Sequence, residues 1–131
     1  MLPHIEEARQ ALRLADRDIA AFETLRKDSD IHLSIICFHA QQGIEKSLKA
    51  VLFSRQKEFR RTHDLVELSN IVRQCGLVLP VSDDSLLRLT PFAVSFRYDE
   101  MDYESVSVSE VADCLTAVRS WAETQVSEAE K

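Results

Sequence analysis

Four polar side chains recur along one stretch of the sequence at a spacing that keeps them on one edge of a helix. In order they are His39, Gln42, Lys46 and Lys49. Residues three and four apart are neighbours on a helix surface. Two lysines and a histidine on such an edge could hold an anion such as a phosphate, with lysine as a point charge and histidine as a donor. The alternative is a solvated face whose lysine stems cover apolar neighbours.

A second histidine that could do chemistry is His63, in the segment RTHDL at residues 61–65. This segment has the residue types that start a helix, with Thr62 as the expected cap and Asp64 near the positive end of the helix dipole. A histidine at that place could act as a general acid or base. A packing or hydrogen-bonding role at the start of the helix is the alternative.

An arginine and a tyrosine stand next to each other at Arg97 and Tyr98. The arginine could clamp a phosphate while the tyrosine stacks on a base. Alternatively, Arg97 holds the acids of the following loop and Tyr98 fills the end of a helical bundle. Those acids lack the ordered spacing and the glycine of an EF-hand loop, so the sequence predicts no metal site and no cofactor. They are Asp99, Glu100, Asp102 and Glu104.

The three cysteines do not suggest a disulfide framework or a zinc site. Their number is odd, no two form a C-x-x-C pair, and they stand far apart at Cys37, Cys75 and Cys114. This usage is typical of buried thiols in a reducing cytoplasm. Because no run of about 18 apolar residues and no signal peptide is visible, we expect a cytoplasmic protein without a membrane span.

Length and composition bound the class of fold. We expect the 131 residues to form one domain, 1–131, and a content of 45% apolar residues suffices for a core. The sequence has only two glycines and three prolines, which favours long helices over a sheet with many turns. The net charge of −6 argues against broad binding of nucleic acid, because that needs a basic face.

Apolar spacing predicts two long helices in the first half of the chain. A stripe with steps of three and four predicts a helix over residues 3–27. A second helix is expected over residues 31–57, with its cap within residues 28–30. Apolar residues lie on more than one side of it, which is typical of a central helix or of one at an oligomer interface. Ala40 and Gly43 would let another helix come close.

Three shorter helices are expected to follow. Their boundaries come from turn and capping residues: Gly76 at the end of the third helix, Ser82 or Asp83 at the start of the fourth with a kink at Pro91, and Ser109 at the start of the fifth, which frays from Ser127. The predicted fold class is therefore all-α, an up-and-down bundle of four to five helices whose first two helices are antiparallel.

Three segments together resemble the HEPN domain family, the higher eukaryotes and prokaryotes nucleotide-binding domain. They are FHAQQGIEKSLKAVL at 38–52, THDLVEL at 62–68 and FRYDE at 96–100. The first is similar to the Gln-Gln-x-x-Glu-Lys-x-x-Lys-Ala core of that family, the second to its Thr-His-Asp-Leu and the third to its Arg-Tyr. They occur in the family's order, and the resemblance extends from about Ile5 to Trp121.

The resemblance implies a helical bundle that often forms a homodimer. Prokaryotic members commonly partner a minimal nucleotidyltransferase in toxin–antitoxin-like modules, and some members are metal-independent ribonucleases. The ribonuclease signature is an arginine followed four to six residues later by a histidine. Arg97 has no histidine at that distance. His63 could replace it only if the fold brought the two side chains together.

The predicted function is therefore that of a non-catalytic HEPN partner of a minimal nucleotidyltransferase, with a nucleotide as a candidate ligand. The alternatives are a ribonuclease toxin that uses Arg97 with His63, and a helical scaffold without a ligand. We expect the nucleotide-binding candidates to line one shared hollow. They are His39, Gln42, Lys46, Lys49, His63, Arg97 and Tyr98.

Overall fold

The computed structural model describes residues 2–93 and 106–131, and in these ranges the chain is a helical bundle without a strand. In chain order its elements are α1 (Pro3–Leu25), α2 (Leu33–Ser54), α3 (Leu65–Gln74), α4 (Asp83–Leu89), the 3₁₀ helix η1 (Thr90–Ala93) and α5 (Val108–Ala129). The predicted all-α fold is confirmed. The pair Arg97 and Tyr98 and the acidic segment after it lie outside the described residues.

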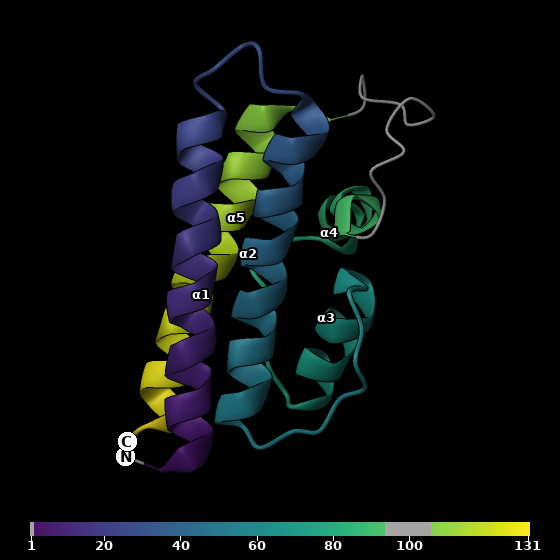
Figure 1. Ribbon diagram of the computed structural model, residues 1–131. Coiled ribbons are helices and arrows are strands. Elements are labelled where there is room, and N and C mark those ends of the chain that lie inside the picture. The colour runs from purple at the N-terminus through teal and green to yellow at the C-terminus, as the bar shows by residue number, and fades with distance from the viewer. Residues whose placement is uncertain (1, 94–105) are drawn as a thin grey trace.

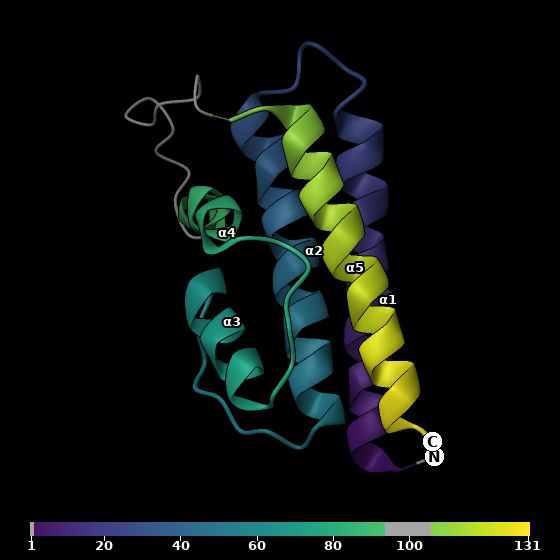
Figure 2. The same cartoon turned by 180° about the vertical axis from the view of Figure 1, so that it is seen from behind.

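The three long helices form the spine of the molecule. Figure 1 shows α1 and α2 side by side and antiparallel, and Figure 2 shows α5 packed along them from the other side. The two termini lie together at one end of the bundle. The short helices α3 and α4 flank α2 on the side away from α1. The prediction that the first two helices are long and antiparallel is confirmed.

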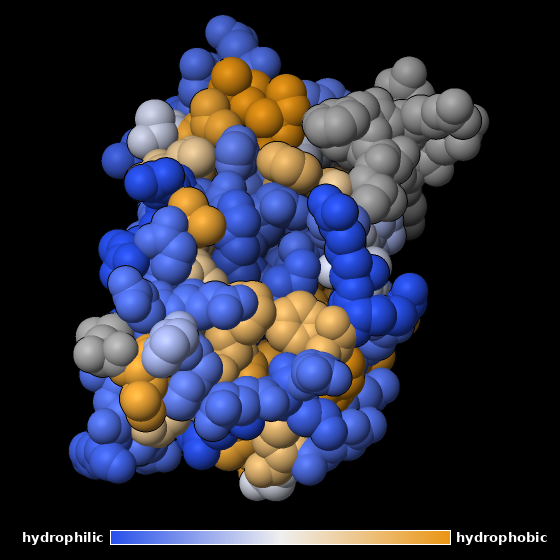
Figure 3. All heavy atoms as spheres, turned by 60° about the horizontal axis from the view of Figure 1, so that its bottom comes forward, coloured by the Kyte–Doolittle hydropathy of each residue, from blue (hydrophilic) through white to orange (hydrophobic). Residues whose placement is uncertain are grey.

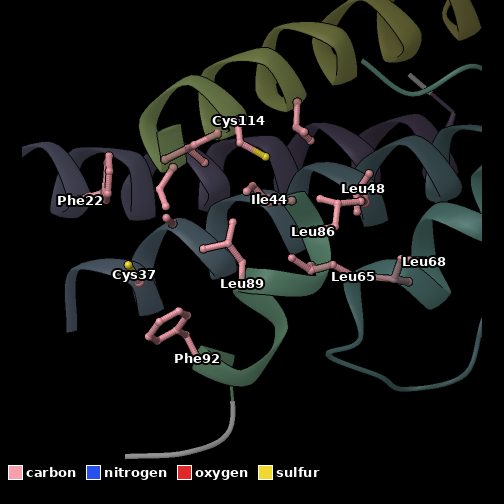
Figure 4. Packing of buried hydrophobic residues seen from close by; sticks show 14 of the residues in the cluster. Phe22, Cys37, Ile44, Leu48, Leu65, Leu68, Leu86, Leu89, Phe92 and Cys114 are labelled. Atoms are coloured by element: carbon pink, nitrogen blue, oxygen red, sulfur yellow. The ribbon is translucent and has the colours of Figure 1, made fainter. Parts of the chain in front are cut away.

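The helix α2 is the central element, as its apolar residues on several sides predict. Most of its side chains are buried, and it contacts α1, α3, α4 and α5. Figure 4 shows Ile44 and Leu48 of α2 in one cluster with Leu86 and Leu89 of α4 and with Cys114 of α5. Burying each such leucine contributes about 1.5–3 kcal/mol. Although α2 is apolar, no helix in the described ranges is long and apolar enough to cross a membrane.

Gly43 lies where α1 and α5 both approach α2. A Cβ atom at this position would be 2.8 Å from Leu115 Cδ1 and 3.6 Å from Ile19 Cγ1. The neighbouring Ala40 is fully buried. The close approach explains why a glycine is kept here, although it costs about 1 kcal/mol relative to alanine in a helix. The predicted packing role of the glycine is confirmed.

The start of α2 differs from the prediction. Its cap is His32, whose Nδ1 accepts a hydrogen bond from the backbone N–H of Ser34 at 3.2 Å. The expected cap within residues 28–30 is wrong. There the Oδ1 atom of Asp28 instead accepts from the backbone N–H of Asp30 at 2.9 Å, so this carboxylate shapes the connection before the helix.

The start of α3 is also displaced from the prediction. Asp64 is the cap, because its Oδ1 atom accepts from the backbone N–H groups of Val66 at 3.0 Å and Glu67 at 3.2 Å. The expected cap Thr62 lies two residues earlier, and its hydroxyl accepts from the backbone N–H of Asp64 at 3.1 Å. Both side chains thus support the turn, but only the aspartate satisfies donors of the helix itself.

The helix α5 begins earlier and ends later than expected. Ser107, and not Ser109, is its cap. The helix includes Val108, whose side chain packs against the main core, and this contact explains the two additional residues. The expected fraying from Ser127 is wrong because Arg9 of α1 donates to the Ser127 hydroxyl at 3.1 Å.

The boundaries of α3 and α4 agree with the sequence in other respects. Gly76, at a φ of +80°, follows the end of α3, and Ser82 caps α4. At Pro91 the α-helical geometry of α4 has changed to the 3₁₀ helix η1, because proline lacks the N–H that the α-helix would use. Leu86 and Leu89 are buried as expected.

Candidate functional site

The histidine and the first lysine of the predicted edge meet a carboxylate of α1. His39 Nδ1 donates to Asp18 Oδ1 at 3.1 Å, and Lys46 Nζ donates to Asp18 Oδ2 at 2.5 Å. His39 and Lys46 are two helical turns apart and therefore reach the carboxylate from both sides. Asp18 is only 9% exposed. A carboxylate this buried needs partners of opposite charge, and this contact ties α1 to α2.

The second lysine and His63 meet at another carboxylate, that of Glu45 on α2. Its Oε2 atom accepts from Lys49 Nζ at 3.0 Å, and its Oε1 atom accepts from His63 Nδ1 at 2.8 Å. Glu45 is 3% exposed, so it is more deeply buried than Asp18. Lys49 reaches it because residues four apart share a helix face, whereas His63 comes from the segment before α3.

Gln41 completes the hydrogen bonding around Glu45. This fully buried side chain uses both amide protons, one to Glu45 Oε1 at 3.1 Å and one to the backbone carbonyl of His63 at 3.1 Å. Its carbonyl oxygen accepts from Gln42 Nε2 at 2.6 Å. The amide therefore fixes the segment before α3 against α2 and holds His63 beside the carboxylate.

Five of the seven predicted nucleotide-binding residues thus fall into two groups, one around Asp18 and one around Glu45. The other two, Arg97 and Tyr98, lie outside the described residues. A groove at the end of α2 is lined by Lys49 and by none of the other four. The role of these seven residues in binding a nucleotide stays a prediction.

The charges of the two groups are balanced by ion pairs. Each lysine has a carboxylate oxygen within 3.0 Å, and the lysine side chains are only 30% and 19% exposed. A phosphate that approached Lys46 or Lys49 would compete with a carboxylate that is already in contact. The arrangement therefore holds α2 against α1 and against the segment before α3, and an anion would have to share each ammonium with its carboxylate.

His63 has the geometry of a histidine oriented by a carboxylate. Its Nδ1–H donates to Glu45, so the neutral ring presents Nε2 as a proton acceptor. The side chain is 48% exposed, which lets a ligand reach it. A carboxylate that fixes the tautomer of a half-exposed histidine is the arrangement that general base catalysis uses.

The thiols and the acids offer no second centre in the described ranges. Burial raises the pKa of Cys37 to about 12 and that of Cys114 to about 11, so both remain protonated at neutral pH. Burial of these two thiols agrees with the prediction, while Cys75 is only partly buried. Among residues 2–93 and 106–131, no three or more histidine, cysteine and acidic side chains gather where they could hold a metal ion.

The sequence analysis missed the two carboxylates that organise the site. A signal for Asp18 is present in the sequence, because it follows Ala15 by three residues and precedes Phe22 by four, on the apolar stripe. A carboxylate on a core stripe requires a cationic partner. The sequence predicts for Glu45 only an ion pair with Lys49 four residues later on the same helix. Nothing in the neighbouring residues predicts that the His63 side chain contacts Glu45.

Comparison with known proteins agrees with this fold. The family model of the HEPN domain matches residues 8–128. A search of curated protein sequences gave no match. The crystal structure of an archaeal HEPN homologue superposes with a TM-score of 0.63 at 20% sequence identity, over 92% of this chain and 98% of that chain. At this identity the structural likeness shows the fold alone. Because the family match spans nearly the whole chain, the chain belongs to the HEPN family.

Proposed function

We propose that this HEPN protein is a non-catalytic module that binds a minimal nucleotidyltransferase in a toxin–antitoxin-like pair. The observation that carries the proposal is the incomplete ribonuclease signature in a member of this family. No histidine follows Arg97 anywhere in the sequence. Without that imidazole, the arginine lacks the partner that the ribonuclease signature uses to activate a 2′-hydroxyl or to protonate a leaving group.

The ion pairs on α2 support a binding role over a catalytic one. Lys46 is held by Asp18 and Lys49 by Glu45, so neither is a bare charge that could stabilise a developing anion. These pairs instead make α2 rigid against α1 and against the segment before α3. A rigid helical surface is suited to recognition by a folded partner.

Association with the enzyme is the direct test. The genes beside this one are first searched for a minimal nucleotidyltransferase. The full chain is then mixed with that enzyme, and the masses are measured by light scattering after gel filtration. We expect a complex whose mass contains both chains, with this protein as a homodimer when it is alone. Separate elution of the two proteins at micromolar concentrations would contradict the proposal.

A nucleotide bound along α2 forms the second part of the proposal. The residues expected to contact the nucleotide are the seven named from the sequence, with Lys46 at the centre of the polar edge of α2. Titration with ATP and GTP should show binding that Lys46→Ala weakens by about tenfold, because one charge-assisted contact is lost. Lys27→Ala, which changes an exposed lysine just after the end of α1, serves as the control. Equal binding by both variants, or none by the unaltered chain, would remove this part and leave a scaffold without a ligand.

A ribonuclease is the second candidate function, and the contact between Glu45 and His63 favours it. This histidine is oriented and half-exposed, as a general base must be. Ribonuclease activity would require Arg97 to lie close to His63, within one chain or across a dimer. It predicts RNA cleavage that both Arg97→Ala and His63→Ala abolish.

A further inference from the structure

A groove of about 680 Å³ lies where α2 ends, on the end of the molecule that holds both termini. Its volume is within the range of small-molecule sites. Figure 3 looks onto this end and shows apolar surface set among hydrophilic side chains. His4 and Glu7 of α1 line one side, and the end of α2 with the segment after it lines the other. A ligand in the groove would therefore contact two separate parts of the chain.

Two aromatic rings provide the apolar surface of the groove. Phe53 of α2 and Phe59 of the following segment lie with their ring centroids 5.4 Å apart and their planes at 48°. Each ring is partly buried against the core and partly exposed. Exposed ring faces of this kind accept a flat apolar group by stacking.

The two sides of the groove carry opposite net charge. On the α1 side Glu7 contributes a carboxylate. On the other side Lys57 and Arg61 outnumber the single acid Glu58. Lys49 also lines that side, but an ion pair within α2 already compensates its charge. With histidine neutral, the groove is therefore acidic on the α1 side and basic on the side of α2, and its charges balance as a whole.

These opposite charges do not neutralise one another within the fold. In residues 2–93 and 106–131, none of the four side chains has an ion-pair partner within 4.0 Å, and all four are exposed. Elsewhere the same two helices bring opposite charges into contact, as Lys46 of α2 does with Asp18 of α1. The groove instead keeps its acidic and basic sides apart, so a ligand that satisfies both must itself carry a positive and a negative group.

The backbone at Gln56 is a separate sign of function at this groove. Gln56 has a φ of +54° just after α2, where its own N–H bonds to the Phe53 carbonyl and the next N–H to the Leu52 carbonyl, both at 3.0 Å. Glycine is the usual residue at this position because a side chain is strained there. Strained backbone of this kind gathers at ligand sites. Gln56 is exposed and lines the groove, so the strained position supplies an amide that glycine would lack.

We propose that this groove binds an aromatic amino acid as its zwitterion. The ring of the ligand stacks on Phe53 and Phe59. Its ammonium pairs with Glu7 on the α1 side, and its carboxylate pairs with Lys57 and Arg61 on the other side. The three charged side chains are long and exposed, so they can converge on a ligand whose two charges are close together. The proposal does not depend on a nucleotidyltransferase partner.

Three probes that differ by one charged group test whether the ligand is a zwitterion. The uniformly labelled full chain is titrated with L-tryptophan, with tryptamine, which lacks the carboxylate, and with 3-indolepropionate, which lacks the ammonium, and amide chemical shifts are followed. We expect L-tryptophan to bind with a Kd of about 1 mM, as is usual for a ligand of this size, and to shift signals within residues 4–7 and 49–61. Each analogue should bind about fivefold more weakly, because one exposed charge contact is lost. An analogue that binds as tightly as L-tryptophan, or no saturable shift, would overturn the proposal.

Neutral variants of the two sides should give opposite patterns. Glu7→Gln should weaken L-tryptophan and tryptamine about fivefold and leave 3-indolepropionate unchanged. Arg61→Gln should weaken L-tryptophan and 3-indolepropionate by about the same factor and leave tryptamine unchanged. Glu6→Gln and Lys27→Gln, which alter exposed charges outside the groove, should change none of the three. Impaired folding would weaken all three ligands together, so the crossed pattern is specific to the site. Equal effects on all three ligands in either groove variant would contradict the assignment.

The amide of Gln56 is assigned a hydrogen bond to the carboxylate of the ligand, and Gln56→Gly tests this role. The change should raise the thermal midpoint of unfolding, because it relieves strain at the end of α2. It should also weaken L-tryptophan and 3-indolepropionate, since the amide N–H donor is lost. Equal binding of L-tryptophan by the glycine variant would contradict the role of the amide.

Discussion

At the level of single residues, the chemistry of α2 depends on which groups its cations already contact. Lys46 and Lys49 look alike in the sequence, and each has its own buried carboxylate in the fold. Removing one partner of a buried pair leaves an uncompensated charge, which costs more than the pair itself contributes. The carboxylates are therefore as important to the edge as the lysines.

Replacement of Glu45 tests this pairing. Glu45→Ala should lower the free energy of unfolding by about 3 kcal/mol, because the Gln41 amide and the Lys49 ammonium lose their buried acceptor. Urea denaturation followed by circular dichroism measures the loss. Glu23→Ala, which removes an acid half exposed on α1, should cost less than about 1 kcal/mol. Equal losses in the two variants would show that the Glu45 centre is not structural.

At the level of helices, the position of α2 between its neighbours is set by small side chains. Ala40 and Gly43 let α1 and α5 approach, and the buried leucines of α2 then reach α4. The apolar stripes predicted the long helices well, because burial on one face imposes the helical period. The caps in the structure, His32, Asp64 and Ser107, lie a few residues from the predicted ones. Several polar side chains near each boundary can cap a helix, and tertiary contacts determine which of them does.

Two substitutions of Gly43 separate helix propensity from crowding. Gly43→Ala should stay within about 1 kcal/mol of the unaltered protein, because the gain in helix propensity offsets the shift of the Leu115 methyl group. Gly43→Val should lower the free energy of unfolding by about 2 kcal/mol, since its branches meet Ile19 and Leu115 together. Thermal and urea unfolding measure both. A stable valine variant would mean that the close approach is absent.

At the level of the whole molecule, the two ends of the chain are joined. Arg9 of α1 pairs with Glu123 of α5 and with Glu130 directly after that helix, and Arg119 pairs with Asp16 at 2.8 Å. These ion pairs hold the start of α1 against the end of α5. They also explain why α5 remains helical beyond Ser127.

This closure should depend on pH. The hydrogen bond from Arg9 holds the pKa of Glu123 below its ordinary value of 4.5. A carboxyl whose pKa is lowered by folding stabilises the native state above pH 4.5 and loses that contribution as the pH falls through the folded value. Because the pair is partly exposed, we expect less than about 1 kcal/mol. Urea unfolding of the unaltered chain and of Glu123→Gln should differ at pH 7 and converge as the pH is lowered progressively below 4.5. A constant difference would contradict this assignment.

The fold could be predicted from the sequence to a much greater extent than the site. Helical periods and few breakers are local properties, so the bundle and its central helix followed from them. The partners of His39 and His63 are carboxylates 21 and 18 positions away, and no spacing rule relates residues so far apart. The groove was missed for the same reason, because its lining combines the start of α1 with the end of α2.

The central claim is that this HEPN protein does not cleave RNA. Incubation of the purified protein with RNA tests this claim most directly. The full chain is incubated with single-stranded RNA, and the products are resolved on a denaturing gel. We predict intact RNA at all times, with the unaltered protein and His63→Ala indistinguishable. Cleavage by the unaltered protein that is lost in His63→Ala and retained in His4→Ala would contradict the account and establish the Glu45–His63 pair as catalytic.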